Sequence, residues 1–210
     1  VINTSGIGKR SEALENNILE VKKHRSFDSR WVLDSNLRKG DKLIVSGTVG
    51  DHGVTILSAQ EGYNFGSQIK SDVTPLNKVV IKLLNVGGIV AMKDPTRGGL
   101  SNSLNEWSIK SKVGIMVQES KVPIRGDVKA ACEMLGIDPM EIGNEGKVLI
   151  GVVPQKAEEI LAALRETKEG RNAEIIGEAT SDFSEVVLKT VVGGKRIMAP
   201  PIGDPIPRIC

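Results

Sequence analysis

The order of apolar runs along the chain limits its fold more than any other feature. Amphipathic segments with apolar residues at i, i+3, i+4 and i+7 predict helices, and short apolar runs bounded by turn residues predict strands. Both kinds of segment are mixed along the chain, but the final three predicted strands, over 173–177, 186–191 and 196–198, follow one another without a helix between them. This order favours an α+β domain in which helices pack on a mixed or antiparallel sheet.

The same patterns predict the other elements. Strands are expected over 1–3, 42–46, 89–92, 113–117 and 147–153, and helices over 54–64, 76–84, 127–135 and 157–164. A further helix opens at about Gly99, and Leu100, Leu104 and Trp107 are expected to face the interior because they recur at helical spacing. No internal repeat interrupts this arrangement.

The two ends of the chain differ from the regular middle part. Residues 9–39 are charged, look irregular and contain turn signals, so they are predicted to form a linker. The first strand begins at Val1 without an initiator methionine or a cap, which suggests a piece of a longer polypeptide. Residues 1–39 are therefore interpreted as the remnant of an upstream domain with its linker, 40–198 as the main domain and 199–210 as a proline-rich tail.

Composition argues against several classes of function. The 210 residues carry a net charge of +2 with no basic block, so no nucleic-acid partner is expected. No apolar run is long enough to span a bilayer and no secretory leader is visible, which predicts a cytoplasmic protein without a membrane partner. Two cysteines, Cys132 and Cys210, and two histidines are too scattered for a structural zinc site, so no metal site is predicted in this chain.

The chain ends in a cysteine that follows a proline-rich segment. Pro200, Pro201, Pro205 and Pro207 fix φ and remove backbone donors, which makes the tail stiffer than a Gly/Ser linker. A semi-rigid arm of this kind can present the Cys210 sulfur to another active site. The alternative is that the terminal thiol is an accident of sequence, since chain ends are often unconstrained.

A glycine-rich turn follows the strand predicted over 42–46. In Ser46-Gly47-Thr48-Val49-Gly50-Asp51-His52-Gly53 the glycines recur every three residues between a strand and a helix, where backbone amides can approach an anion. The spacing matches neither the dinucleotide-binding motif nor the P-loop. Gly50, Asp51, His52 and Gly53 are candidate site residues, although turn geometry and packing more often explain residues in such a turn.

A second turn concentrates polar groups at a helix start. Asp94, Thr96, Arg97, Gly98 and Gly99 combine a carboxylate, a hydroxyl, a guanidinium and two glycine amides within six residues. This set offers a phosphate both positive charge and directed donors. The alternative is a helix N-cap at Thr96 or Asp94, with Arg97 in solvent.

The second turn resembles a known family element. Lys93-Asp94-Pro95-Thr96-Arg97-Gly98-Gly99-Leu100 is similar to the D-x-T-R-G-G-L element that opens the C-terminal domain of the aminoimidazole ribonucleotide (AIR) synthetase, or PurM, superfamily of ATP-dependent enzymes. Together with 45–53 and the closing Pro207-Arg208-Ile209-Cys210, it resembles the HypE family of hydrogenase maturation factors. The resemblance covers essentially the whole chain and implies a PurM-type C-terminal domain.

The resemblance also implies a reaction. In that family a HypF-like carbamoyltransferase transfers a carbamoyl group to the terminal cysteine, which corresponds to Cys210. ATP then activates the carboxamide oxygen, so that phosphate leaves and a thiocyanate remains. The cyanide passes to iron on the HypC–HypD scaffold for a nickel-iron hydrogenase. A terminal arm suits a sulfur that must visit several proteins.

Further roles follow from the same resemblance. Glu145 in Gly143-Asn144-Glu145-Gly146-Lys147 matches an N-E-G-K/R element, and a buried, hydrogen-bonded carboxylate there could take the amide protons. Thr96 and Arg97 are expected on the phosphate side, and Asp51 and His52 are expected to shape the site for the tail.

The chain departs from the family at its front. The family builds most of its ATP site, its Mg²⁺ ligands and its homodimer contacts from an N-terminal domain that residues 1–39 largely lack. Two alternatives therefore stay open. One is another enzyme of the superfamily, such as a selenophosphate synthetase or a thiamine-monophosphate kinase, and the other is a non-catalytic module that only docks to HypF or the scaffold.

Overall fold

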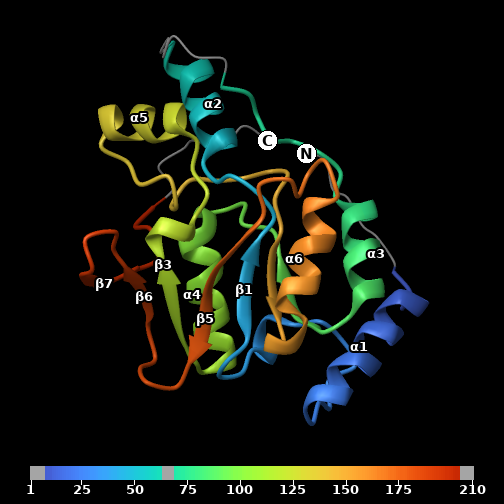
Figure 1. The fold of residues 1–210 in the computed structure, drawn as a ribbon. Coiled ribbons are helices and arrows are strands. Elements are labelled where there is room, and N and C mark those ends of the chain that lie inside the picture. The colour runs from blue at the N-terminus through green and yellow to red at the C-terminus, as the bar shows by residue number, and fades with distance from the viewer. Residues whose placement is uncertain (1–7, 63–68, 204–210) are drawn as a thin grey trace.

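The computed structural model describes residues 8–62 and 69–203, whose elements are shown in Figure 1. Within these ranges seven strands form one sheet in the order β2-β4-β1-β5-β3-β6-β7. Neighbouring strands are antiparallel except β3 and β6, which run parallel, so the sheet is mixed. The strands are β1 (Lys42–Val45), β2 (Ile89–Lys93), β3 (Gly114–Gln118), β4 (Leu149–Val152), β5 (Glu174–Thr180), β6 (Val186–Lys189) and β7 (Lys195–Ile197).

Six α-helices accompany the sheet in the described part of the chain. They are α1 (Glu12–His24), α2 (Asp51–Glu61), α3 (Asn77–Val86), α4 (Gly99–Ser111), α5 (Gly126–Leu135) and α6 (Ala157–Arg165). Three short 3-10 turns complete the element order: η1 (Asp34–Asn36), η2 (Glu119–Lys121) and η3 (Pro154–Lys156). The fold is therefore the α+β arrangement that the sequence predicts, with helices packed on a mixed sheet.

Helices cover both faces of the sheet because its interior strand β1 is apolar on both sides. Alternate residues of a strand point to opposite faces. In β1, Leu43 and Val45 join one apolar core, whereas Ile44 joins a second core with side chains of α3 and α6. The first core receives the inward face of α4, whose three predicted core residues are each 0% exposed: Leu100, Leu104 and Trp107.

The prediction of an irregular linker over 9–39 is wrong for residues 12–24, which form α1. Ser11 caps this helix by accepting the Leu14 N–H at 3.2 Å. The buried Asn17 side chain lies against strand β2, where it donates to the Ile89 carbonyl and accepts the Ile89 N–H, both at 2.8 Å. One side-chain amide thus completes the backbone pairing of an edge strand. The Ser11 cap and the spacing of Leu14, Ile18 and Val21 were available in the sequence as helix signals.

The other predicted elements between 42 and 198 are confirmed with shifted ends. The largest shift is in α2, which begins at Asp51 rather than at Val54. Gly50 is its N-cap and has a φ of +88°, so the glycine turn leads directly into the helix. The strand predicted over 1–3 and the terminal Cys210 lie outside the described residues.

Several connections gather at one end of the sheet. Strand β1 points toward this end in Figure 1, and α2 and α5 lie beyond it. These two helices share a small apolar core built from Val54, Val128, Ala131, Cys132 and Ile142. The turns that carry the predicted site residues belong to this end of the sheet.

Among the described residues no helix is both long and apolar enough to cross a membrane.

Candidate functional site

The turn between β2 and α4 carries five predicted site residues. The Thr96 hydroxyl donates to Asp94 Oδ2 at 2.5 Å. Gly98 is the N-cap of α4 with a φ of +67°, and no side chain caps the helix, so the alternative of an N-cap at Thr96 or Asp94 is wrong. A Cβ on Gly99, whose φ is +61°, would lie 2.5 Å from the Ile142 carbonyl oxygen. Both glycines are therefore needed for the shape of the turn.

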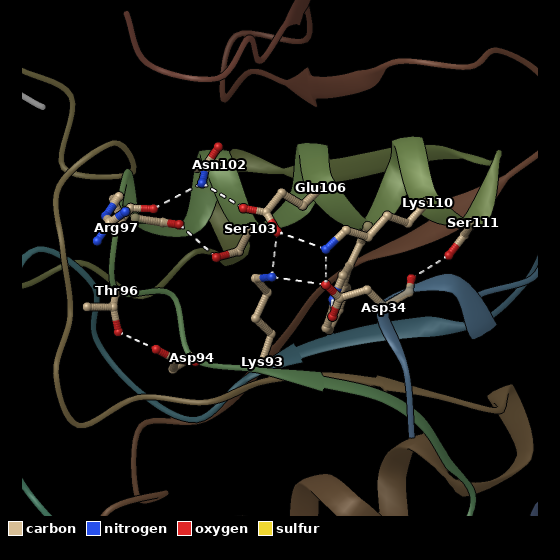
Figure 2. A network of polar contacts seen from close by, with 12 residues as sticks. Asp34, Lys93, Asp94, Thr96, Arg97, Asn102, Ser103, Glu106, Lys110 and Ser111 are labelled. Carbon is tan, nitrogen blue, oxygen red and sulfur yellow. Dashed lines mark hydrogen bonds and ion pairs between the residues drawn. The ribbon is translucent and has the colours of Figure 1, made fainter. Parts of the chain in front are cut away.

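Arg97 is the positively charged group of this turn. Its side chain is exposed, and within residues 8–62 and 69–203 no carboxylate or carbonyl pairs with its guanidinium. Its own carbonyl accepts a hydrogen bond from the Asn102 side chain at 3.1 Å, which holds the turn on the first turn of α4 (Figure 2). The N–H groups of Gly99 and Ser101 at this helix start donate to the Thr96 carbonyl at 3.4 Å and to the Met140 carbonyl at 2.9 Å. An exposed guanidinium next to a helix N-terminus without a side-chain cap suits an anionic ligand such as phosphate.

An ion-pair network beneath this turn fixes α4 to its surroundings. Asp34 of η1 contacts Lys93 Nζ at 3.0 Å and Lys110 Nζ at 2.7 Å, and both lysines also contact Glu106 of α4 (Figure 2). Asp34 also accepts a hydrogen bond from the Trp107 indole at 2.9 Å. Burial opposes ionisation of Asp34, but the hydrogen bonds from Lys110, Lys93 and Trp107 outweigh it and lower its pKa. The network ties η1, β2 and α4 together.

The glycine turn after β1 is built around two buried side chains. Ser46 Oγ accepts the Val148 N–H at 3.0 Å, which joins the end of β1 to the segment before β4. The Thr48 hydroxyl donates to one oxygen of Asp51, and the other oxygen is buried and forms no hydrogen bond with the described residues. Burial raises the pKa of Asp51, although the Thr48 hydrogen bond and the charges of Lys147 and Arg125 oppose the shift.

Asn144 joins the two predicted turns. Its side chain is 0% exposed, and its Oδ1 accepts the Gly50 N–H at 2.8 Å. Its Nδ2 donates to the Pro95 carbonyl at 3.1 Å and to the Ile142 carbonyl at 3.2 Å. Its backbone N–H also donates to Pro95 at 3.2 Å. One buried amide therefore holds the glycine turn and the turn of Arg97 in a fixed relation.

Glu145 lies beside this junction but differs from the expectation. Its side chain is exposed, and no group of the described chain donates to its carboxylate. The backbone is held instead, because the Glu145 N–H donates to Asp72 Oδ1 at 3.1 Å. Asp72 also forms an ion pair with Lys147, whose Nζ lies 3.0 Å from Oδ2. The prediction of a buried carboxylate at Glu145 is wrong. Residues 69–74 cover the backbone of the turn and leave the Glu145 side chain exposed.

A pocket opens between these segments. It has a volume of about 290 Å³ and is lined by residues of four segments, among them Gly47, Thr48, Asp72, Lys147, Lys168 and Glu169. Gly47 contributes because a Cβ there would lie 3.1 Å from Lys147 Cε, so the glycine leaves room for the lysine stem. His52 lies at the neighbouring turn, where its Nδ1 is 2.9 Å from Ser71 Oγ.

The beginning of the tail lies on α4 next to the Arg97 turn. Ser101 Oγ donates to the Ala199 carbonyl at 2.7 Å, and Asn105 Nδ2 donates to the Met198 carbonyl at 2.8 Å. A Cβ on Gly98 would lie 3.0 Å from the Pro201 ring. Nine residues follow Pro201 to the end of the chain (210 − 201). A chain of that length reaches at most about 30 Å.

Cys210 lies outside the described residues, so the only described thiol is Cys132. It is buried without a disulfide, and burial raises its pKa to about 11. A thiol in this setting is a poor nucleophile. Within the described ranges no three His, Cys, Asp or Glu side chains are placed to hold a metal ion.

The structure thus brings together the predicted residues from 50–53, 94–99 and 145. Sequence reasoning missed three residues that connect them: Asp72, Asn144 and Lys147. Asn144 and Lys147 stand within the Gly-Asn-Glu-Gly-Lys run that singled out Glu145, and their flanking glycines were the available signal. Asp72 has no such signal, because its role depends on a chain crossing between distant segments.

Comparison with known proteins gives a consistent result. Residues 38–189 match the family described as AIR synthase related protein, C-terminal domain. The chain is 51% identical over 180 residues to a hydrogenase expression/formation protein of Methanocaldococcus jannaschii, covering 85% of this chain and 53% of that protein. It is 38% identical over 174 residues to carbamoyl dehydratase HypE of Escherichia coli K12, covering 83% and 52%.

Solved structures agree. HypE in complex with ATP superposes with a TM-score of 0.79 at 40% identity, over 82% of this chain and 54% of that one. HypE in a HypE–HypF complex superposes with a TM-score of 0.78 at 42% identity, over 80% and 55%. A thiamine-monophosphate kinase of Stenotrophomonas maltophilia shares the fold at 20% identity, with a TM-score of 0.56 over 75% of this chain and 52% of that one. The chain spans about half the length of the curated relatives it matches.

Proposed function

The chain belongs to the AIR synthase related family, within it to HypE, and from this premise we propose that it is the C-terminal domain of a carbamoyl dehydratase for hydrogenase maturation. Relatives named carbamoyl dehydratase HypE, at 38–44% identity, support the proposal. In this proposal residues 40–198 form the body of the domain and 199–210 form a carrier arm. Residues 1–39 lead in from an upstream nucleotide-binding domain, with α1 packed against the body.

One observation carries the proposal. A buried Asn144 places the turn of Arg97 and the glycine turn of Asp51 side by side, and the tail begins on α4 next to the first of them. The groups that we propose to bind phosphate and the start of the tail thus lie at one helix N-terminus. A domain that only docked to partners would have no need of this arrangement.

The proposed reaction removes the elements of water from a thiocarbamate on Cys210. The carbon–oxygen bond of the S-carbamoyl group breaks, the oxygen leaves on phosphate, both N–H protons are lost, and a C≡N bond forms. The exposed carboxylate of Glu145 would take a proton from the nitrogen, since a base at the edge of a pocket can reach a substrate carried on a tail. Asp51 and His52 would shape the site that receives the arm.

The residues present suit part of a nucleotide site. ATP, when bound, supplies the phosphoryl group that activates the carboxamide oxygen. Arg97 and the Gly98 N–H would hold phosphate, because the guanidinium is unpaired within the described ranges and the helix start carries no side-chain cap. The Thr96 hydroxyl and the Gly99 N–H would join them by leaving their present acceptors, which are Asp94 Oδ2 and, at 3.4 Å, the Thr96 carbonyl. Mg²⁺ would be bound mainly by the upstream domain.

The proposed partners follow from the reaction. A HypF-like carbamoyltransferase would load Cys210, in line with the relative solved as a HypE–HypF complex. The HypC–HypD scaffold would accept the cyanide on its iron, and the full-length protein would act as a homodimer.

Mass analysis of the C-terminal peptide tests the proposal. The full-length protein is incubated with a HypF-like enzyme, carbamoyl phosphate and ATP, and the peptide is expected to gain a carbamoyl group and then lose one water. Cys210→Ala must abolish both changes, whereas Cys132→Ala, at the buried thiol, must leave them intact. A peptide that stops at the carbamoyl stage would favour a docking module, which the half-length match to relatives makes the second candidate. Modification that persists in Cys210→Ala would refute the carrier assignment.

A further inference from the structure

We propose that Asp72 is a positioning residue for the proposed dehydration, because it holds the backbone of Glu145 and compensates the charge of Lys147 beside it. The inference rests on the proposed function and adds to it a side chain from the connection between α2 and α3, which carries none of the family motifs. One carboxylate from residues 69–74 thus contacts two residues of the turn that contains Glu145.

The contacts of Asp72 are directed at the turn on both sides of Gly146. Asp72 Oδ1 accepts the Glu145 N–H at 3.1 Å, and Oδ2 lies 3.0 Å from Lys147 Nζ. The second contact is an ion pair without hydrogen-bond alignment, since Oδ2 is buried and has no hydrogen-bond partner in the part of the chain that the structure describes. Residues 145 and 147 are thus held by the same carboxylate from a segment 73 positions away along the chain.

Close backbone packing makes this contact specific to the turn. A Cβ on Gly146 would lie 1.8 Å from the Asp72 carbonyl oxygen and 2.9 Å from Thr74 Cγ2. The two segments therefore touch at their main chains, and only glycine fits at 146. Such an approach fixes where the Glu145 side chain leaves the backbone, because the neighbouring peptide planes cannot rotate freely.

The ion pair between Asp72 and Lys147 is largely shielded from water. The side chains of Asp72 and Lys147 are 4% and 10% exposed, so water screens neither charge well. Both line the 290 Å³ pocket. Lys147 carries three donor hydrogens, and Asp72 is the only carboxylate of the described chain within ion-pair distance of its Nζ. Asp51 lies close enough for its charge to interact with those of Asp72 and Lys147. Removing the Asp72 carboxylate would leave the ammonium without its ion-pair partner two residues from Glu145.

A second contact ties the same segment to the glycine turn. Ser71 Oγ lies 2.9 Å from His52 Nδ1, and it also accepts the Val73 N–H at 3.3 Å. Ser71 and Asp72 therefore connect α2 to the Glu145 turn. The other charged groups around this place are those that line the pocket or act on Asp51, namely Arg125, Lys168 and Glu169.

Replacement of Asp72 separates its two roles. Asp72→Asn keeps an acceptor for the Glu145 N–H but removes the charge that faces Lys147, whereas Asp72→Ala removes both. We expect single-turnover dehydration in the full-length protein to slow about three- to ten-fold in the first variant and about 100-fold in the second. In Asp72→Asn the acid limb of the pH–rate profile moves to lower pH by roughly half a unit, because removal of a negative charge favours the ionised form of a nearby base.

A matched control tests whether the charge alone matters. Glu169→Gln removes a carboxylate from the same pocket, but among the described residues no hydrogen bond or ion pair joins Glu169 to Glu145 or Lys147. We expect its acid limb to stay within about 0.2 unit of the wild type, since a partly exposed charge is screened. A limb that does not move in Asp72→Asn, or that moves equally in both variants, would overturn the inference.

A readout without catalysis keeps this inference separate from the proposed function. Hydrogen exchange at the Glu145 amide should speed about ten-fold in Asp72→Ala and much less in Asp72→Asn, relative to Glu169→Gln. Equal exchange in all three variants would refute the positioning role, whatever the activity. If hydrogen exchange at the Glu145 amide changes as expected but the wild type does not catalyse dehydration, the proposed function is refuted instead. An acid limb that survives in Glu145→Gln would refute only the assignment of the base.

Discussion

Asn144 provides the sharpest test of how the candidate site is held together. Asn144→Ala deletes an amide that is 0% exposed and makes three side-chain hydrogen bonds, to Gly50, Pro95 and Ile142. Pro95 keeps a partner, because its carbonyl also accepts the backbone N–H of residue 144 at 3.2 Å. The Gly50 N–H and the Ile142 carbonyl lose the partner that the amide supplies, in a place that water does not reach.

The expected cost follows from these two groups. An unsatisfied buried donor or acceptor costs about 1 to 3 kcal/mol, so two of them lower the free energy of unfolding by about 2 to 6 kcal/mol. For a chain of this size each kcal/mol lowers the melting temperature by about 2 to 4 °C, which gives a fall of about 4 to 24 °C. Because the amide joins both turns, the phosphate binding that we propose for Arg97 should weaken as well.

Urea unfolding of the full-length protein measures this cost, with Asn102→Ala as the matched control. Asn102 also makes two side-chain hydrogen bonds, to Arg97 and Glu106, but it is half-buried on α4 and water can replace it. The control should lose less than about 1 kcal/mol. An Asn144→Ala variant that unfolds at the same urea concentration as the control would refute the junction as we describe it.

Two further predictions concern the Arg97 turn and its support. Asp34→Asn should flatten the fall of melting temperature between roughly pH 5 and pH 2. The pKa of Asp34 is lowered, so its ion pairs stabilise the fold above the ordinary pKa of the carboxyl and are lost as the pH falls through the folded value. Parallel curves for variant and wild type, measured by calorimetry, would contradict this. Gly99→Ala should unfold the turn, at a cost of more than about 3 kcal/mol, since its Cβ would meet the Ile142 carbonyl at 2.5 Å. Gly126→Ala, in open space at the start of α5, serves as its control in the same scans and should be neutral or slightly stabilising.

Local patterns were enough for most of the architecture. The helical spacing of Leu100, Leu104 and Trp107 predicted the buried face of α4, and short apolar runs predicted the strands, because both signals are complete within about ten residues. The polar groups of the turn at 94–99 could also be recognised from the sequence, because they lie within six residues. Helix α1 was missed although its cap and spacing were present, since its high charge was interpreted as a linker.

Only the tertiary structure decided which distant residues meet. Asn144 lies 94 positions from Gly50 and 49 from Pro95, and Asp72 lies 73 positions from Glu145. A local pattern carries no information about such pairs, because their contact depends on how strands of a mixed sheet bring their connecting turns to the same end. The sequence therefore determined the elements, the glycine turns and the family, whereas the buried amide and the carboxylate that assemble the site were determined by the packing of those elements against one another.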